Sequence, residues 1–138
     1  MAGLAKMVLV VEDSPVQALA LRQLLEQKGL QVVRAMDGQG GITMAEQYLP
    51  DAIILDIQMP VMDGLEACRR LKQNPKTKDI PVVMLTAHGE PSMLMRGLGL
   101  GAVDFIPKDA FSDIVLIETL RQLHILKSAK DDDAQGQA

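Results

Sequence analysis

Short apolar runs alternate along this chain with segments that carry helix signals, and this alternation constrains the fold more than any other feature. Each run is long enough for one strand, and Met7–Val11 is continuously apolar, as expected for a central strand buried on both faces. Strands that alternate with helices predict an α/β fold with a parallel sheet. The short connections between them would be right-handed crossovers. The expected architecture is a doubly wound, five-stranded parallel sheet with helices on both faces. The predicted strands are Met7–Val11, Gln31–Ala35, Ala52–Leu55, Val82–Thr86 and Val103–Ile106.

Local signals mark the ends of the intervening helices. Ser14-Pro15 is typical of an N-cap followed by proline at the first helical position, and Gln17 completes a capping-box pattern. Gly29 suits the C-terminal cap of the same helix. We interpret Asp37-Gly38 as a turn. The predicted helices are Pro15 to about Lys28, Gly41–Tyr48, Leu65–Lys72, Ser92–Gly99 and Phe111–Leu126.

Composition narrows the class of protein. The 138 residues suit one domain, predicted over 6–126 and followed by a disordered tail over 127–138. Net charge of −4 and 2% aromatic residues argue against nucleic acid and anionic membranes as direct partners. A lone Cys68 excludes an internal disulfide and a cysteine zinc site. With no signal peptide and no long apolar stretch, we expect a cytoplasmic protein.

Polar residues follow the predicted strands where a parallel sheet binds its ligands. Ligands bind at the carboxyl ends of the strands in such sheets. Because clustered carboxylates repel one another, we expect a cation among them. Taken singly, the acids could face solvent, the threonine could simply end a strand, and the lysine could be solvated. The residues concerned are Glu12, Asp13, Asp56, Thr86 and Lys108.

Four motifs in order give the chain a resemblance to a known family. They are V-V-E-D-S-P at 10–15, I-L-D-I-Q-M-P-V-M-D-G at 54–64, M-L-T-A at 84–87 and D-F-I-P-K at 104–108. Over about Lys6–Leu126 the chain resembles the receiver domain of two-component response regulators, of the single-domain chemotaxis type. The resemblance implies a flavodoxin-like sheet with strand order 2-1-3-4-5.

The resemblance also implies a metal-dependent phosphorylation site. Asp56 would accept a phosphoryl group from a histidine kinase or a phosphotransfer protein. The metal, Mg²⁺ or Mn²⁺, prefers oxygen ligands. The implied ligands are Glu12 (largely through a water), Asp13, Asp56 and the backbone carbonyl of Gln58.

Further roles follow from the same resemblance. Thr86, Ala87 and Lys108 would bind the phosphoryl group. Thr86 and Phe105 would form a switch that responds to phosphorylation; the alternative for Phe105 is a plain core residue, and it could be both. The residues implied to tune dephosphorylation are Gln58 and His88.

One position departs from the family pattern. The family usually has proline after the lysine, with a cis peptide bond, and this chain has Asp109 after Lys108. Without proline a cis bond costs about 2.5–4 kcal/mol. We therefore expect the Lys108–Asp109 bond to be trans, or cis only under strain.

The last predicted helix has apolar residues on two sides, where a surface helix needs one. The preceding helix adds methionines, which suit adaptable contacts. We predict a homodimer or target interface on these two helices; the alternative is local packing. The residues predicted for this interface are Met93, Met95, Ile114, Val115 and Ile125.

The predicted function is a phosphorylation-dependent signalling switch, with no enzymatic activity beyond weak self-catalysed phosphoryl transfer and autodephosphorylation. A receiver-fold interaction scaffold that is not phosphorylated is the alternative. An aspartyl phosphatase is disfavoured because Gln58 stands where a second acid is needed. With twelve residues after Leu126 we expect no output domain, which leaves a stand-alone receiver or one excised from a hybrid kinase.

Overall fold

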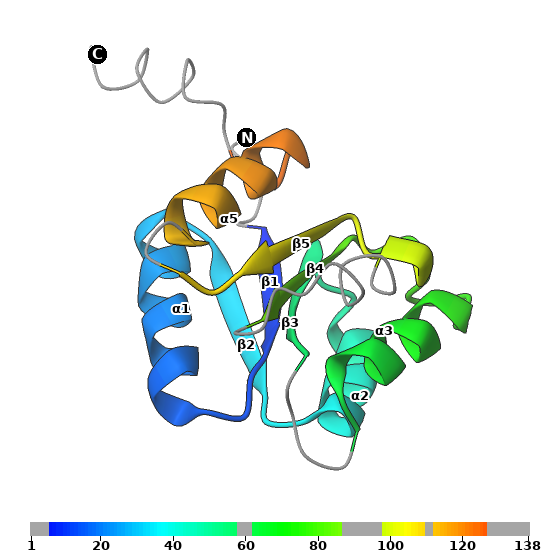
Figure 1. Ribbon diagram of the computed structural model, residues 1–138. Helices are drawn as coiled ribbons and strands as arrows, with labels where there is room; N and C mark the ends of the chain where they lie inside the picture. The colour runs from blue at the N-terminus through cyan, green and yellow to red at the C-terminus, as the bar shows by residue number, and fades with distance from the viewer. Residues whose placement is uncertain (1–5, 58–61, 87–97, 110–111, 127–138) are drawn as a thin grey trace.

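Five parallel strands form one sheet in the computed structural model, which describes residues 6–57, 62–86, 98–109 and 112–126 (Figure 1). The strand order is β2-β1-β3-β4-β5, which confirms the order that the resemblance implied. The strands are β1 Met7–Val11, β2 Gln31–Ala35, β3 Ala52–Asp56, β4 Val82–Thr86 and β5 Asp104–Pro107. The helices are α1 Pro15–Gln27, α2 Gly38–Tyr48, α3 Gly64–Gln73 and α5 Ser112–Gln122.

The strands pair in a register that aligns their carboxyl ends. Val11 is the partner of Ala35 on one side and of Leu55 on the other. Farther along the sheet, Asp56 pairs with Leu85. The last pair of β4 and β5 is Thr86 with Pro107. Residues that end or follow these strands therefore share one edge of the sheet.

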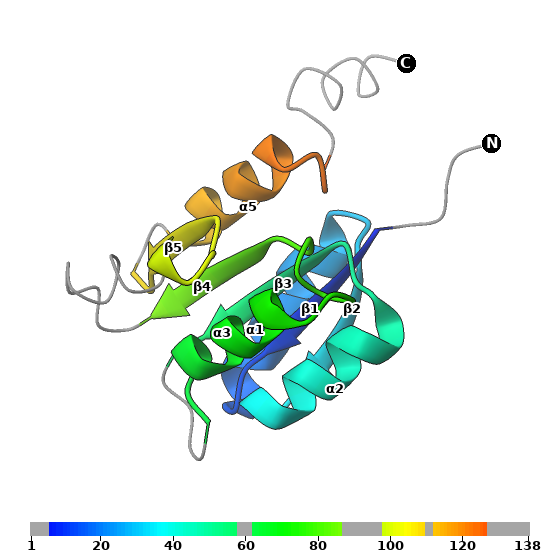
Figure 2. The ribbon, with the colours of Figure 1, turned by 90° about the vertical axis from the view of Figure 1, so that its right-hand side faces the viewer.

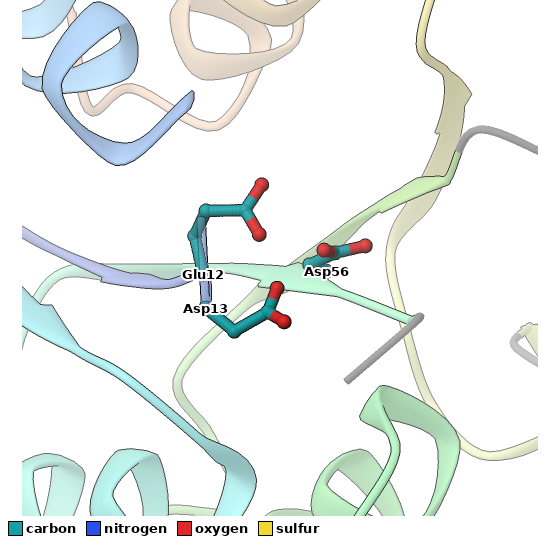
Figure 3. Close-up of side chains that lie close together, drawn as sticks. All are labelled: Glu12, Asp13 and Asp56. Carbon is teal, nitrogen blue, oxygen red and sulfur yellow. The ribbon is translucent and has the colours of Figure 1, made fainter. Parts of the chain in front are cut away.

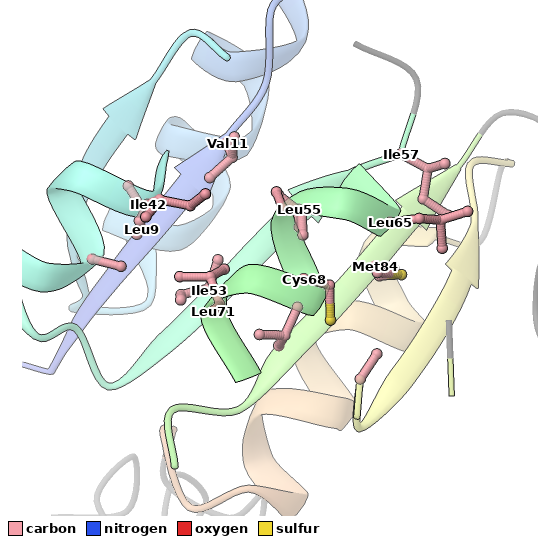
Figure 4. Close-up of a cluster of buried hydrophobic side chains, with 14 of the residues drawn as sticks. Leu9, Val11, Ile42, Ile53, Leu55, Ile57, Leu65, Cys68, Leu71 and Met84 are labelled. Atoms are coloured by element: carbon pink, nitrogen blue, oxygen red, sulfur yellow. The ribbon is translucent and has the colours of Figure 1, made fainter. Parts of the chain in front are cut away.

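Helices cover both faces of the sheet, as predicted. α1 and α5 lie on one face, and α2 and α3 on the other (Figure 2). Each face has its own aliphatic core. The core under α2 and α3 includes Leu9, Ile53, Leu55, Leu65 and Met84 (Figure 4). The core under α1 and α5 includes Val8, Val10, Ile54, Leu116 and Leu120.

Helix α2 begins three residues before the predicted start, at Gly38. Asp37, interpreted from the sequence as part of a turn, is the N-cap, and its carboxylate accepts a hydrogen bond of 2.7 Å from the Gly40 N–H. Gly41 then packs against the sheet, since a Cβ there would lie 2.8 Å from Val11 Cγ2. Gly41 is therefore required by the close approach of this helix to β1.

Helix α5 ends at Gln122, four residues before the predicted end. The chain then turns back through His124, which has a φ of 62°, and the Ile125 N–H donates to Leu120 O at 2.9 Å. Ile125 is 8% exposed and belongs to the core under α1 and α5. Its prediction as an interface residue is therefore wrong, because the turn directs it inward.

Of the apolar residues predicted for the interface, Ile114 and Val115 of α5 are exposed, at 69% and 43%. Met93, Met95 and Phe111 lie outside the described residues, as do the tail over 127–138 and most of the helix predicted over Ser92–Gly99.

In the described part of the chain, no helix has the length and apolar character needed to cross a membrane.

Candidate functional site

Three carboxylates meet at the carboxyl edge of the sheet. Glu12 and Asp13 follow β1, and Asp56 ends the neighbouring β3 (Figure 3). One oxygen from each lies within 4.8 Å of the others. Glu12 and Asp56 are only 2% and 6% exposed, whereas Asp13 is exposed. The cluster predicted from the strand ends is therefore present, and two of its acids are largely buried.

Lys108 supplies the positive charge next to these acids. Its Nζ lies 2.9 Å from Glu12 Oε1 and 3.4 Å from Asp56 Oδ2. The same ammonium donates to Gln17 Oε1 at 2.5 Å. An ammonium has three donors, and here each faces a residue from a different part of the fold: Glu12 after β1, Asp56 on β3 and Gln17 on α1. The Lys108 backbone is fixed as well, because its N–H donates to Thr86 O at 2.6 Å.

One ammonium does not compensate two buried carboxylates. The pKa of Glu12 is raised, first by burial and then by the hydrogen bond and charge of Asp56; Lys108 acts in the opposite direction with less effect. The site thus holds more negative charge than it neutralises. A cation bound beside these acids would relieve the repulsion.

The first turn of α1 uses its capping residues differently from the predicted capping box. Ser14 Oγ accepts from the Gln17 N–H at 3.3 Å, which is half of the box. The Ser14 N–H donates to Glu12 Oε2 at 3.4 Å instead of to the Gln17 side chain. Gln17 is thereby available to contact Lys108, a role that the sequence pattern gave no reason to expect.

Gly64 brings α3 against the backbone of the site. A Cβ at this position would lie 2.3 Å from Asp56 O and 2.7 Å from Ile57 Cα. The Gly64 N–H donates to Ile57 O at 2.9 Å, which closes the loop after β3. Asp63, the N-cap, accepts from the Glu66 N–H at 2.9 Å. The Asp63-Gly64 pair therefore fixes the start of α3 directly against the end of β3.

Arg34 is a further residue that the sequence reasoning missed. It lies on β2, and its guanidinium donates to the backbone carbonyls of Glu12 and Asp13. The available signal was an arginine in the otherwise largely apolar strand Q-V-V-R-A.

The remaining predicted site residues divide into two groups. Thr86 is fully buried at the end of β4, and Phe105 is 8% exposed in the core under α2 and α3. No described peptide bond is cis, so Lys108–Asp109 is trans, as expected. Gln58, Ala87 and His88 lie outside the described residues.

The donor set suits a hard divalent cation. Magnesium and manganese are bound by carboxylate and carbonyl oxygens, and the three clustered side chains offer only oxygen. The same acids could hold such an ion directly or through water.

Comparison with known proteins agrees with this geometry. Residues 8–121 match the family model described as the response regulator receiver domain. The chain belongs to this family. It is therefore a receiver domain of the two-component response regulator type, with a flavodoxin-like sheet.

Individual relatives show different lengths around the same domain. The chain is 39% identical to response regulator PleD of Caulobacter vibrioides over 131 residues, which is 95% of this chain and 29% of PleD. It thus spans less than a third of that relative. It is 34% identical to protein PilH of Pseudomonas aeruginosa over 109 residues, which is 79% of this chain and 90% of PilH.

A solved structure bears on the metal. The receiver domain of sensor histidine kinase PA1611 from Pseudomonas aeruginosa has a TM-score of 0.78 and 28% identity, covering 86% of this chain and 97% of that one. That crystal structure holds a magnesium ion coordinated in its active-site cleft.

Proposed function

We propose that this receiver domain is phosphorylated on Asp56 in a Mg²⁺-dependent reaction with a histidine kinase or phosphotransfer protein. The observation that carries the proposal is the contact of Lys108 Nζ with both Glu12 and Asp56, beside three carboxylates whose oxygens lie within 4.8 Å. A buried nucleophile, a fixed cation and a cluster of oxygen ligands are the parts that phosphoryl transfer requires.

The transfer uses Asp56 as a nucleophile. A carboxylate oxygen of Asp56 forms a bond to phosphorus while the phosphorus–nitrogen bond of a phosphohistidine breaks. The imidazole nitrogen keeps the electron pair of that bond and takes up a proton. Lys108 Nζ, 3.4 Å from Asp56 Oδ2, is placed to pair with an oxygen of the transferred group.

The metal would be held by Asp13 and Asp56, with Glu12 acting through a water and the Gln58 carbonyl as an additional ligand. When bound, the ion neutralises charge on the transferring phosphoryl group. The protein's own part is to hold the carboxylates close together, although burial raises the pKa of Glu12.

The output of the switch would be a protein contact. Thr86 would bind the phosphoryl group together with Ala87, and Phe105 would follow its movement. Ile114 and Val115 on α5 form the exposed apolar part of a surface for a second copy or a target. Gln58 and His88 would set the lifetime of the phosphorylated state. We place the protein in the cytoplasm, with no activity beyond self-catalysed phosphoryl transfer and autodephosphorylation.

Intact-mass spectrometry after incubation with acetyl phosphate tests the proposal. With Mg²⁺ the mass should rise by one phosphoryl group, about 80 Da. The gain should be absent when Mg²⁺ is chelated and absent in Asp56→Asn. Asp113→Asn, an exposed change on α5, is the matched control and should be labelled like wild type.

Equal labelling of Asp56→Asn would contradict the assignment. No labelling of wild type, either by acetyl phosphate or by phosphorylated phosphotransfer proteins, would favour the unphosphorylated interaction scaffold instead.

A further inference from the structure

Arg34 donates hydrogen bonds to the backbone of Glu12 and Asp13, the acidic turn that follows β1. It is half-buried on the edge strand β2, where it pairs with Val10 of β1. Its Nε and Nη2 donate to Glu12 O at 3.1 and 2.9 Å, and Nη2 also donates to Asp13 O at 3.2 Å. In the described part of the chain, no carboxylate forms an ion pair with it.

The three acids of the site are not held equally. Glu12 and Asp56 are buried and contact Lys108. The Asp13 carboxylate is exposed, and among the described residues it makes no hydrogen bond or ion pair. Its position beside the other two therefore depends on its backbone. Arg34 is the side chain that fixes that backbone.

We propose that Arg34 is a positioning residue for the metal site. By holding the carbonyls of Glu12 and Asp13, it keeps the Asp13 carboxylate within reach of those of Glu12 and Asp56, and so sets the affinity for Mg²⁺. This inference rests on the metal site of the proposed function. It extends that site to a residue on a neighbouring strand that does not itself bind metal or phosphate.

The sign of the effect separates positioning from charge. Arginine carries a positive charge close to a cation site, so removing the charge alone would tighten Mg²⁺ binding. Losing the positioning would weaken it, since residues that orient metal ligands commonly matter about 10–100-fold in affinity. Weaker binding in a variant without the guanidinium therefore supports positioning specifically.

The chain offers a matched control in Arg22. Its Nη2 donates to the backbone carbonyl of Val32 at 3.1 Å, so it ties α1 to β2 by the same type of bond. Val32 lies two residues before Arg34, and its carbonyl belongs to no residue of the acidic cluster. Arg22→Met removes an arginine-to-carbonyl bond and one positive charge without touching the acidic turn.

The test is calorimetric titration of the full chain with MgCl₂. Arg34→Met should bind Mg²⁺ about tenfold more weakly than wild type, and Arg22→Met should bind like wild type. Arg34→Lys should be intermediate, because lysine keeps the charge but loses the forked geometry. In the acetyl phosphate reaction, Arg34→Met should need more Mg²⁺ for the half-maximal rate, with a near-normal rate at saturation.

Equal or tighter binding by Arg34→Met would overturn the role of Arg34. If circular dichroism shows that Arg34→Met does not fold, Arg34→Lys decides, and wild-type affinity in that variant would overturn the role. A wild-type protein that does not bind Mg²⁺ would overturn the metal site itself and Arg34's role with it. The two failures are therefore distinguishable in one titration series.

Discussion

Glu12 and Glu66 are the same residue type in opposite electrostatic situations. Glu66 lies on the surface of α3, where hydrogen bonds from Arg69 and Arg70 lower its pKa to about 2. Glu12 is buried at the carboxyl edge of the sheet, where burial and Asp56 raise its pKa despite the contact with Lys108. The charged form of Glu66 is stabilised by its two arginines, whereas burial of charged Glu12 lowers the free energy of unfolding.

The contrast shows where the chain departs from the arrangement that favours stability. A half-buried surface acid between two arginines needs no further partner, because the arginines and water satisfy its hydrogen bonds. Two buried acids that share one ammonium leave negative charge for a ligand to neutralise. A buried acid with a raised pKa beside a second buried acid is typical of a functional site.

The largest expected effect comes from removing the shared cation. Lys108→Met leaves Glu12 and Asp56 buried without it and should lower the free energy of unfolding by about 3 kcal/mol at neutral pH. Arg70→Met, which removes one exposed partner of Glu66, is the matched change on α3 and should barely alter stability. Urea unfolding of both variants measures the difference, and equal losses would remove the distinction between the two regions.

A smaller effect, with opposite signs for the two glutamates, should follow from pH. The raised pKa of Glu12 contributes stability below its ordinary value of 4.5, and this is lost as pH rises through the folded-state pKa. Glu12→Gln should therefore be more stable than wild type at neutral pH, by about 1 kcal/mol, and similar to it in acid.

Glu66 gives the opposite pattern. Its lowered pKa contributes stability above 4.5 that is lost as pH falls through about 2. Glu66→Gln should be slightly less stable than wild type at neutral pH, with the difference vanishing in strong acid. Urea unfolding as a function of pH measures both variants without Mg²⁺. A Glu12→Gln variant that loses stability at neutral pH would show that the Lys108 contact outweighs burial.

The smallest of these effects is expected at the exposed acid. Asp13→Asn removes one charge from the cluster and should raise the metal-free thermal midpoint by no more than a few degrees, equivalent to about 1 kcal/mol or less. It should also abolish the further rise that millimolar Mg²⁺ gives to wild type. Asp113→Asn is the control. Thermal unfolding that shows an unchanged midpoint and an intact Mg²⁺ response would argue against a metal at Asp13.

The sequence predicts the sheet and the convergence of acids because both depend on period and position. Strand ends in a parallel sheet meet at one edge. Their positions in the sequence are therefore enough to predict that Glu12, Asp56 and Lys108 lie close together. Helix ends were harder. Gly38 and Gly41 lower helix propensity, yet the close approach of Gly38 to Met62 and of Gly41 to Val11 of β1 requires them.

The contacts of long side chains could not be predicted in this way. Arg34 and Gln17 reach across elements, and the periodicity of a strand or helix does not encode the final direction of such side chains. Ile125 was misplaced for a related reason. Continuing the helical pattern past Gln122 put it on the exposed side, and the turn at His124 reverses that assignment.

Mapping the site of phosphorylation tests the central claim most directly. Wild-type protein would be treated with acetyl phosphate and Mg²⁺, reduced with borohydride to convert an aspartyl phosphate to homoserine, and digested for peptide sequencing by mass spectrometry. The account predicts homoserine at position 56 alone, and none when Mg²⁺ is chelated. Homoserine at another aspartate, or at position 56 regardless of Mg²⁺, would contradict it.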